Sequence, residues 1–179
     1  TDSIFNDFQK AFDTVSHPKL LAKIASYGIQ ENLPNWFASF LNGRSQSVKI
    51  SGCLSDALHI TSGVPQGSVL GPTLFLLFVN DIIDEVTGLN VNMNLFADDV
   101  KLYSVVNEVN DLIAACNRIT EWAKIWQMQI AVDKCSVLRL TNSRSISLLV
   151  YTLAGIQLSI VNEMRDLGVV IDAKLNFNS

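Results

Sequence analysis

Apolar residues recur along this chain with two different spacings, and each spacing predicts its own kind of element. In residues 17–28 and 107–127 the apolar side chains stand three or four positions apart, which is typical of an amphipathic helix. Residues 45–50 alternate between apolar and polar side chains instead. A Ser51-Gly52 turn separates them from residues 57–61, so the sequence predicts a β-hairpin here.

Two further helices are predicted from denser apolar clusters. The first covers residues 31–41 and is expected to bury its large apolar side chains, which are Leu33, Trp36, Phe37 and Phe40. The second follows a loop at residues 62–68 and carries Leu74, Phe75, Phe78 and Ile82. Two glycines and one proline in that loop would let the backbone approach a ligand closely.

The remaining apolar stretches have β character and lie between the predicted helices. Strands are expected at residues 4–8, 92–95, 100–106 and 137–140, with shorter β segments at 151–158 and 167–171. The strands at 92–95 and 100–106 meet at residues 97–99, which predicts a second hairpin. Strands separated by helices in this way favour an α+β fold, with a mainly antiparallel sheet and helices packed on one face.

Composition narrows the class of protein. With 179 residues, 49% hydrophobic and 17% charged, the chain is long and apolar enough for one domain with a real core, or for a piece of something larger. Its 13 basic and 17 acidic residues give a net charge of −4, which excludes a polybasic nucleic-acid binder. The longest apolar run, residues 74–79, is far too short to span a membrane. Three widely spaced cysteines predict neither disulfides nor a zinc site, and indicate a reducing compartment.

The candidate chemistry starts from two adjacent acids, Asp98 and Asp99, at the tip of the second hairpin. In a regular strand adjacent side chains point to opposite faces, so only a turn lets both reach one site. Carboxylates held together repel, and a divalent cation relieves this repulsion. Oxygen ligands without nearby His or Cys favour Mg²⁺ or Mn²⁺, and Asp7 at the end of a neighbouring strand would complete a two-metal site. A solvated turn is the other interpretation of this acidic pair.

Three segments taken in order carry a family resemblance. Residues 6–13 (NDFQKAFD), 62–68 (SGVPQGS) and 96–99 (FADD) resemble motifs A, B and C of reverse transcriptases. Finer stretches resemble the non-LTR, LINE-type and jockey-like retrotransposon branch; they are residues 13–21, 71–75, 126–128, 132–135 and 166–172. The resemblance covers essentially the whole chain.

The resemblance implies a polymerase palm with a ferredoxin-like βαββαβ core, occupying residues 1–179 as a single domain from motif A to beyond motif D. It implies RNA-directed DNA polymerase activity, which transfers dNTPs onto a primer 3′-OH. Two Mg²⁺ ions would take part in this reaction, and Mn²⁺ can substitute for them. Asp7, Asp98 and, less centrally, Asp99 would hold these ions, together with the backbone carbonyl of Phe8.

Further site residues follow from the same motifs. Phe12 matches the aromatic residue that blocks a ribose 2′-OH, although an ordinary core Phe would look the same. Gln66 matches a glutamine that lies against the incoming nucleotide. Gly63, Pro65 and Gly67 form the loop around it, and turn geometry alone could also explain both glycines.

Motif D and two motif A neighbours complete the set of candidate residues. Lys134 matches the motif D lysine that can protonate the leaving pyrophosphate, and a solvated surface lysine is equally compatible with the sequence. Asp13 is expected to bind the helix that follows it rather than a metal. Asn6 departs from the family, which usually has an apolar residue before the motif A aspartate; a buried amide there would need partners.

The implied partners are an RNA template, a DNA primer, dNTPs, the fingers and thumb of the same polypeptide, and an endonuclease domain in the full-length protein, with no membrane. The implied location is intracellular, in nucleus and cytoplasm. Without fingers and thumb, the chain alone is expected to have little or no polymerase activity. Two alternatives are other polymerases, namely a group II intron-type reverse transcriptase and an RNA-dependent RNA polymerase. Phe12 argues against the RNA-dependent RNA polymerase. The third alternative is a decayed or domesticated palm that binds nucleic acid or protein without catalysis.

Overall fold

The computed structural model describes residues 1–30, 32–105, 109–140 and 150–175. The chain forms two compact units. Unit 1 consists of Thr1–Gln9, Asp81–Ile125 and Gln129–Ser179, and unit 2 of Lys10–Asn80 and Trp126–Met128. The assignment of residues 1–179 to a single domain stays a prediction.

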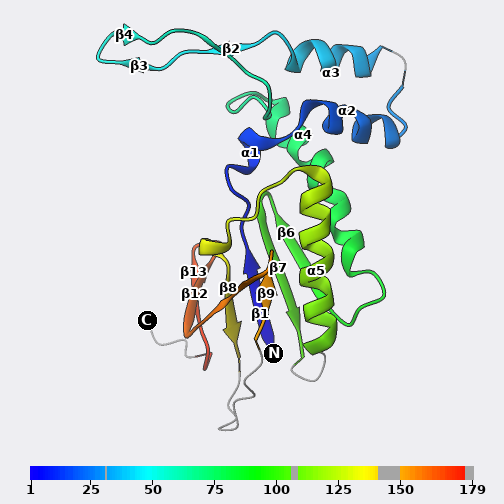
Figure 1. The fold of residues 1–179 in the computed structure, drawn as a ribbon, viewed down its shortest axis with the longest axis vertical. Helices are drawn as coiled ribbons and strands as arrows, with labels where there is room; N and C mark the ends of the chain where they lie inside the picture. The colour runs from blue at the N-terminus through cyan, green and yellow to red at the C-terminus, as the bar shows by residue number, and fades with distance from the viewer. Residues whose placement is uncertain (31, 106–108, 141–149, 176–179) are drawn as a thin grey trace. The chain divides into compact units, whose positions relative to one another are not determined.

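A five-stranded sheet forms the centre of unit 1, in the order β11-β8-β1-β7-β6 (Figure 1). Its strands are β1 (Asp2–Asn6), β6 (Asn92–Phe96), β7 (Asp99–Ser104), β8 (Ser136–Arg139) and β11 (Ser159–Val161). All neighbours pair antiparallel except β11 and β8, which are parallel. The predicted α+β class with a mainly antiparallel sheet is therefore confirmed.

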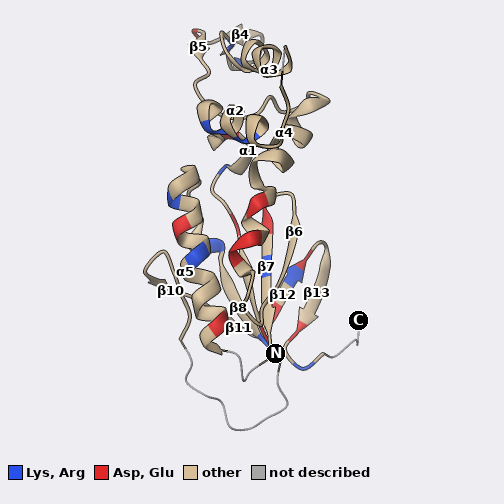
Figure 2. Ribbon diagram, turned by 90° about the vertical axis from the view of Figure 1, so that its right-hand side faces the viewer, with Lys and Arg blue, Asp and Glu red and all other residues tan. Residues whose placement is uncertain are grey.

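Helix α5 (Val109–Trp126) and the hairpin of β12 (Glu163–Asp166) and β13 (Val169–Asp172) lie on opposite sides of this sheet (Figures 1 and 2). The helix buries the apolar side chains of Leu112, Cys116, Ile119 and Trp122. A short hairpin of β9 (Thr152–Leu153) and β10 (Ile156–Gln157) follows β8 in the chain. Among the described residues, the connections include the 3₁₀ helices η1 (Asn80–Val86) and η3 (Val132–Lys134).

Strand β1 ends two residues earlier than the predicted strand at 4–8. Its ladder with β7 ends at the pair Asn6 and Val100, because β7 begins at Asp99. Phe8 lies beyond the ladder, in an isolated bridge with Ile130. The chain therefore leaves the sheet at Asp7.

A buried ion pair joins the other end of β1 to β8. Arg139 donates to Asp2 through Nε at 2.9 Å and through a terminal nitrogen at 2.9 Å. The Tyr151 hydroxyl donates to the same carboxylate at 2.7 Å. Asp2, Arg139 and Tyr151 are at most 8% exposed. This group ties together segments separated by more than 130 residues.

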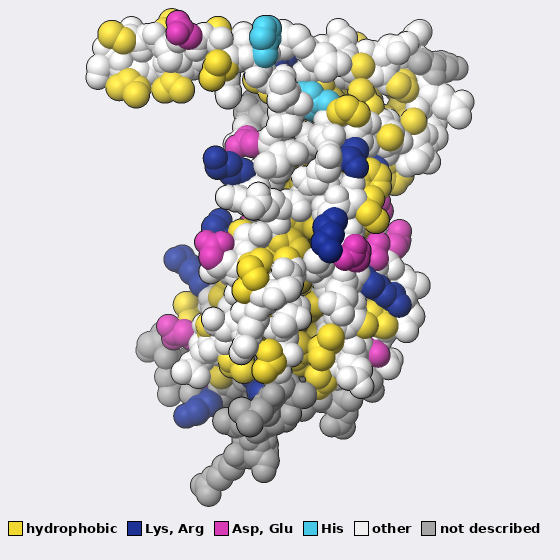
Figure 3. Space-filling view, viewed as in Figure 1, with side chains coloured by type: hydrophobic (Ala, Val, Ile, Leu, Met, Phe, Trp, Pro, Cys, Tyr) yellow, Lys and Arg dark blue, Asp and Glu magenta, His cyan; other side chains and the backbone are white. Residues whose placement is uncertain are grey.

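Unit 2 contains four helices and two small strand pairs. The helices are α1 (Ala11–Thr14), α2 (His17–Ser26), α3 (Leu33–Leu41) and α4 (Leu70–Val79). The strands are β2 (Ser45–Gln46) with β5 (Leu58–His59) and β3 (Lys49–Ile50) with β4 (Cys53–Leu54), which confirm the predicted hairpin. Figure 3 shows hydrophobic side chains on the hairpin surface. The hairpin residues Val48, Ile50, Leu54 and Leu58 are exposed.

The predicted burial of the α3 side chains is wrong, because Leu33 and Trp36 are exposed and Phe37 and Phe40 are only half-buried. Leu33 is 54% exposed and Trp36 is 50% exposed, whereas Leu41 is fully buried. The aromatic residues of α3 cover one another instead. The Trp36 ring stacks on Phe40, with centroids 5.6 Å apart, and meets the Phe37 ring edge-on at 5.3 Å.

Two expectations about the cysteines and the membrane can also be compared with the structure. Cys53 is exposed, Cys116 and Cys135 are buried, and all three are free. Within the described residues, no helix has the length and hydrophobicity needed to cross a bilayer.

Candidate active site

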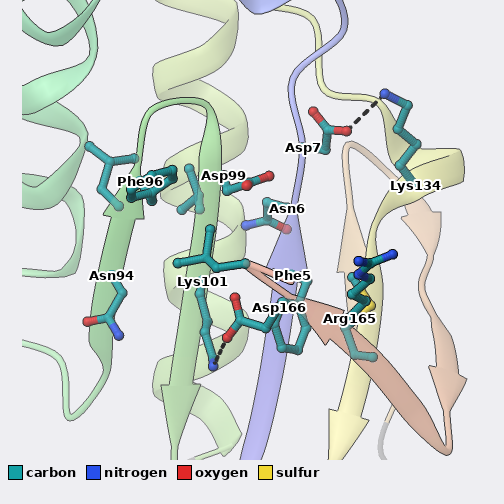
Figure 4. Close-up of a pocket in the computed structure, with 14 residues that line it drawn as sticks. Phe5, Asn6, Asp7, Asn94, Phe96, Asp99, Lys101, Lys134, Arg165 and Asp166 are labelled. Atoms are coloured by element: carbon teal, nitrogen blue, oxygen red, sulfur yellow. Dashed lines mark hydrogen bonds and ion pairs between the residues drawn. The ribbon is translucent and has the colours of Figure 1, made fainter. Parts of the chain in front are cut away.

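The predicted catalytic acids lie at one end of the sheet in unit 1. Asp7 follows the last residue of β1, and Asp98 and Asp99 lie where β6 turns into β7. Because Asn6 pairs with Val100 in the antiparallel ladder, Asp7 and Asp99 come out at the same sheet end. Both residues line one cavity of about 410 Å³ (Figure 4). The hairpin with acids at its tip is thus confirmed.

Lys134 joins this group from η3. The backbone of Ala131 donates to the Asp7 carbonyl at 2.9 Å, which brings the start of η3 against the end of β1. The Lys134 ammonium lies 3.0 Å from Asp7 Oδ2, and the Asp7 carboxylate points toward it (Figure 4). The hydrogen bond to Asp7 raises the pKa of Lys134. The lysine thus has a specific carboxylate partner, although its side chain is 61% exposed.

The acids repel one another in the absence of a cation. Burial raises the pKa of Asp99, and the negative charges of Asp98, Asp7 and Asp166 raise it further. A divalent cation would relieve this repulsion, and carboxylate oxygens are the ligands that Mg²⁺ and Mn²⁺ prefer. In the described parts of the chain, however, no three Asp, Glu, His or Cys side chains already converge on a metal position. The residues therefore fit a divalent site by donor type, provided that Asp7 turns away from Lys134.

Phe8 occupies a core position. Its side chain is 2% exposed, and its ring centroid lies 6.0 Å from that of Trp122 on α5. The proposed role of its backbone carbonyl as a metal ligand stays a prediction.

A second ion pair lines the same cavity and was missed by the sequence analysis. Lys101 Nζ on β7 lies 2.5 Å from Asp166 Oδ2 on β12, and 5.0 Å above the ring of Phe5. This pair links the β12–β13 hairpin to the sheet. No sequence signal could have found it, because the two charges are 65 positions apart in the chain.

Asn6 has a buried side-chain amide. The residue is 5% exposed, and neither polar atom of its amide has a hydrogen-bond partner within the described residues. The alternation of β1 places Asn6 on the sheet face opposite Phe5. The sequence-based expectation that a buried amide here would need partners is therefore not met, and burial without them is costly.

Replacing Asn6 with Leu is expected to stabilise the chain, because Leu branches at the same atom and needs no hydrogen bonds. We expect the free energy of unfolding to rise by about 1–2 kcal/mol, measured by urea denaturation of the 179-residue chain. Asn92→Leu, on an exposed position of β6, should change it by less than about 0.5 kcal/mol. A loss of stability in Asn6→Leu would mean that the amide has a partner or that Leu does not fit.

In unit 2, the loop at residues 62–68 packs against the segment that contains Phe12. Val64 N donates to Phe12 O at 2.8 Å, and Gly63 N donates to Val15 O at 2.7 Å. Gly63 has φ +89°, and a Cβ on it would lie 2.8 Å from the Asp13 Cα. The close approach at Gly63 is therefore made to the protein's own backbone, as the turn-geometry interpretation allows.

The other predicted nucleotide-binding residues lie around this loop. The Phe12 ring is half-buried and stacks on Phe75 of α4, with centroids 4.2 Å apart. The Pro65 carbonyl accepts from the Ser68 hydroxyl at 2.6 Å. Gly67 has φ +78° and open space around it. These contacts hold Phe12 and the loop in a fixed arrangement.

Asp13 has a partner that the sequence analysis did not foresee. Its Oδ1 accepts a hydrogen bond from Gln66 Nε2 at 2.7 Å. Both residues line a polar cavity of about 640 Å³ together with Lys10 and Arg44. The predicted site residues thus meet in two groups: the acids with Lys134 in unit 1, and Phe12 with the glutamine loop in unit 2.

Comparisons with known proteins give a consistent picture. Residues 3–171 match the family described as reverse transcriptase (RNA-dependent DNA polymerase). The chain is 38% identical to the RNA-directed DNA polymerase from mobile element jockey of Drosophila funebris and 34% identical to that of Drosophila melanogaster. These matches cover 98% and 97% of this chain and 20% of each relative, so the chain spans about a fifth of their length.

The fold is similar to that of a solved structure, the apo telomerase from Candida tropicalis truncated from its C-terminal domain. The TM-score is 0.67 at 16% identity, and the match covers 98% of this chain and 34% of the telomerase chain. At this identity the likeness concerns the fold.

Proposed function

Because the chain belongs to the reverse transcriptase (RNA-dependent DNA polymerase) family, we propose that it is the palm segment of an RNA-directed DNA polymerase from a non-LTR retrotransposon. The observation that carries the proposal is the position of Asp7 and the Asp98-Asp99 pair at the same end of an antiparallel sheet. Because three carboxylates gathered at one end of a sheet repel one another, they do not stabilise the fold. Such a group is typical of a catalytic site, and we assign it to nucleotide transfer.

Members of the family generally use divalent metals. In the proposal, Asp7 and Asp98 hold two Mg²⁺ or Mn²⁺ ions with help from Asp99 and the Phe8 carbonyl. Bound ions supply activation of the primer 3′-OH and neutralisation of charge on the triphosphate. When Asp7 turns toward this site, the Lys134 ammonium is released from its 3.0 Å contact and becomes available to protonate the leaving pyrophosphate.

Phe12 is the proposed selector of deoxyribonucleotides. Its ring is braced against Phe75 and cannot easily yield to an additional hydroxyl. In Phe12→Ala we expect the preference for dNTPs over rNTPs to fall ten- to a hundredfold, since shape discrimination of this kind is worth about 1–3 kcal/mol. The measurement is the ratio of kcat/KM values for the two nucleotide classes, with Phe12→Tyr as the control that keeps the ring. Unchanged rNTP use in Phe12→Ala would remove Phe12 from this role.

The proposed substrates are dNTPs, an RNA template and a DNA primer. The proposed partners are the fingers, thumb and endonuclease of a longer polypeptide acting in nucleus and cytoplasm. The polymerase is tested by primer extension with the full-length polypeptide that carries this chain. We expect dNTP incorporation that depends on an RNA template and on Mg²⁺. A folded polypeptide that binds RNA equally well without metal, and with Asp7 and Asp98 both replaced by Asn, yet never extends a primer, would support the non-catalytic alternative.

A further inference from the structure

The Asp13 carboxylate holds the Gln66 amide, and this contact fixes the orientation of the amide. An ionised carboxylate can only accept hydrogen bonds, so only the NH₂ end of the amide can face Asp13 Oδ1 at 2.7 Å. The carbonyl oxygen of the amide must then point away from Asp13. The contact thereby selects one of the two flipped orientations of the glutamine.

Backbone contacts fix the position of Asp13 relative to the loop. The Ser62 hydroxyl donates to Asp13 O at 2.8 Å, and the backbones cross so closely at Gly63 that a Cβ would clash with the Asp13 Cα. The His17 ring nitrogen lies 2.8 Å from Gly63 O and fastens the same crossing. The Asp13 backbone is therefore held against the loop by the Ser62 hydrogen bond and by the close crossing at Gly63.

The Asp13–Gln66 contact contributes little to the stability of the fold. Both side chains are exposed, and exposed charge-assisted contacts contribute little to folding. Their two side chains line the same polar cavity, which also contains the basic side chains of Lys10 and Arg44. A fixed orientation of the amide at the wall of this cavity presents defined hydrogen-bonding groups to a ligand that binds there.

We propose that Asp13 is a positioning residue that orients Gln66 for the incoming nucleotide. The inference rests on the proposed function, because it takes the nucleotide as the ligand of Gln66. By holding the NH₂ end, Asp13 leaves the carbonyl oxygen and one N–H of Gln66 for the nucleotide. Without Asp13 the amide can flip and rotate, so binding must restrict it again and affinity falls.

The test measures dNTP affinity in the full-length polypeptide bound to an RNA template and a chain-terminated DNA primer, on which the nucleotide binds but cannot react. We expect Asp13→Ala to raise the dissociation constant about tenfold, because binding must then restrict the freed Gln66 side chain. In steady-state extension the KM for dNTP should rise by a similar factor while kcat stays within about twofold. Asp56→Ala removes an exposed aspartate elsewhere in unit 2 and is the matched control.

Two further variants separate positioning from a merely structural role. Asp13→Asn keeps an oxygen acceptor for Gln66 and should restore most of the affinity. Asp13→Ala combined with Gln66→Ala should be no weaker than Gln66→Ala alone, because Asp13 acts only through Gln66. Additive losses, or an unchanged dissociation constant in Asp13→Ala, would overturn the inference while leaving the polymerase intact. A wild-type complex that binds no dNTP would overturn the proposed function, and this inference with it.

Discussion

Replacing Asp7 or Asp98 with Asn is expected to reduce RNA-templated primer extension about a thousandfold or more, equivalent to about 4 kcal/mol of transition-state stabilisation. Each substitution keeps the size of the side chain and removes the charge that the proposed divalent ions would require. Asp7 has a second role, because it also holds the Lys134 ammonium. The loss should therefore appear in kcat rather than in the KM for dNTP.

The control for this prediction is Asp84→Asn, which removes an exposed carboxylate from η1 in the same unit. It should extend primers at close to the wild-type rate. Asp98→Asn should not unfold at a lower urea concentration than the wild type, because it relieves repulsion among the acids. Asp7→Asn should unfold at a similar urea concentration, because the contact it loses is to an exposed lysine. Extension that survives in both Asp7→Asn and Asp98→Asn would show that the chemistry does not depend on these acids.

The largest effect on stability is expected from Arg139→Met. Removing the arginine leaves the Asp2 carboxylate buried, with 1% of the residue exposed and only the Tyr151 hydroxyl of its two partners remaining. Breaking a buried pair from one side costs about 3–5 kcal/mol. Urea denaturation of the 179-residue chain measures this loss, and Arg165→Met on the exposed surface of β12 is the matched control.

A second variant shows whether the loss of stability in Arg139→Met comes from the unpaired charge of Asp2. Asp2→Leu combined with Arg139→Met removes both ionised groups, so it should recover a large part of the stability lost in Arg139→Met. If the double variant is less stable than the single one, packing around Asp2 rather than its charge dominates. A loss below about 1 kcal/mol in Arg139→Met would show that water reaches the carboxylate.

The parts of the site that the sequence predicted well depend on local patterns. The alternation before and after Asp98-Asp99 predicts two strands, and two adjacent strands leave the acids at a turn. The sequence also placed Asp7 near the end of the first strand, although the strand ends at Asn6, where its ladder with β7 stops, and not at the apolar Phe8. Periodicity and turn residues carry this information within about ten positions.

The contacts that the sequence did not predict join residues far apart in the chain. Lys101 with Asp166 and Gln66 with Asp13 are ordinary charged and polar residues with no local pattern that marks them as partners. Only the register of the strands and the crossing at Gly63 bring them together. The exposed side of α3 has a related cause: periodicity identifies an apolar face, but not what covers that face.

In the proposed function, Asp7, Asp98 and Asp99 bind divalent cations at the end of the sheet. The most direct test is a titration of the 179-residue chain with Mn²⁺, followed by the water-proton relaxation that bound Mn²⁺ enhances. We predict saturable binding that Mg²⁺ displaces, that is lost in Asp98→Asn, and that is unchanged in Asp84→Asn. Binding of equal strength in the wild type and Asp98→Asn, or no saturable binding by a folded wild-type chain, would contradict the account.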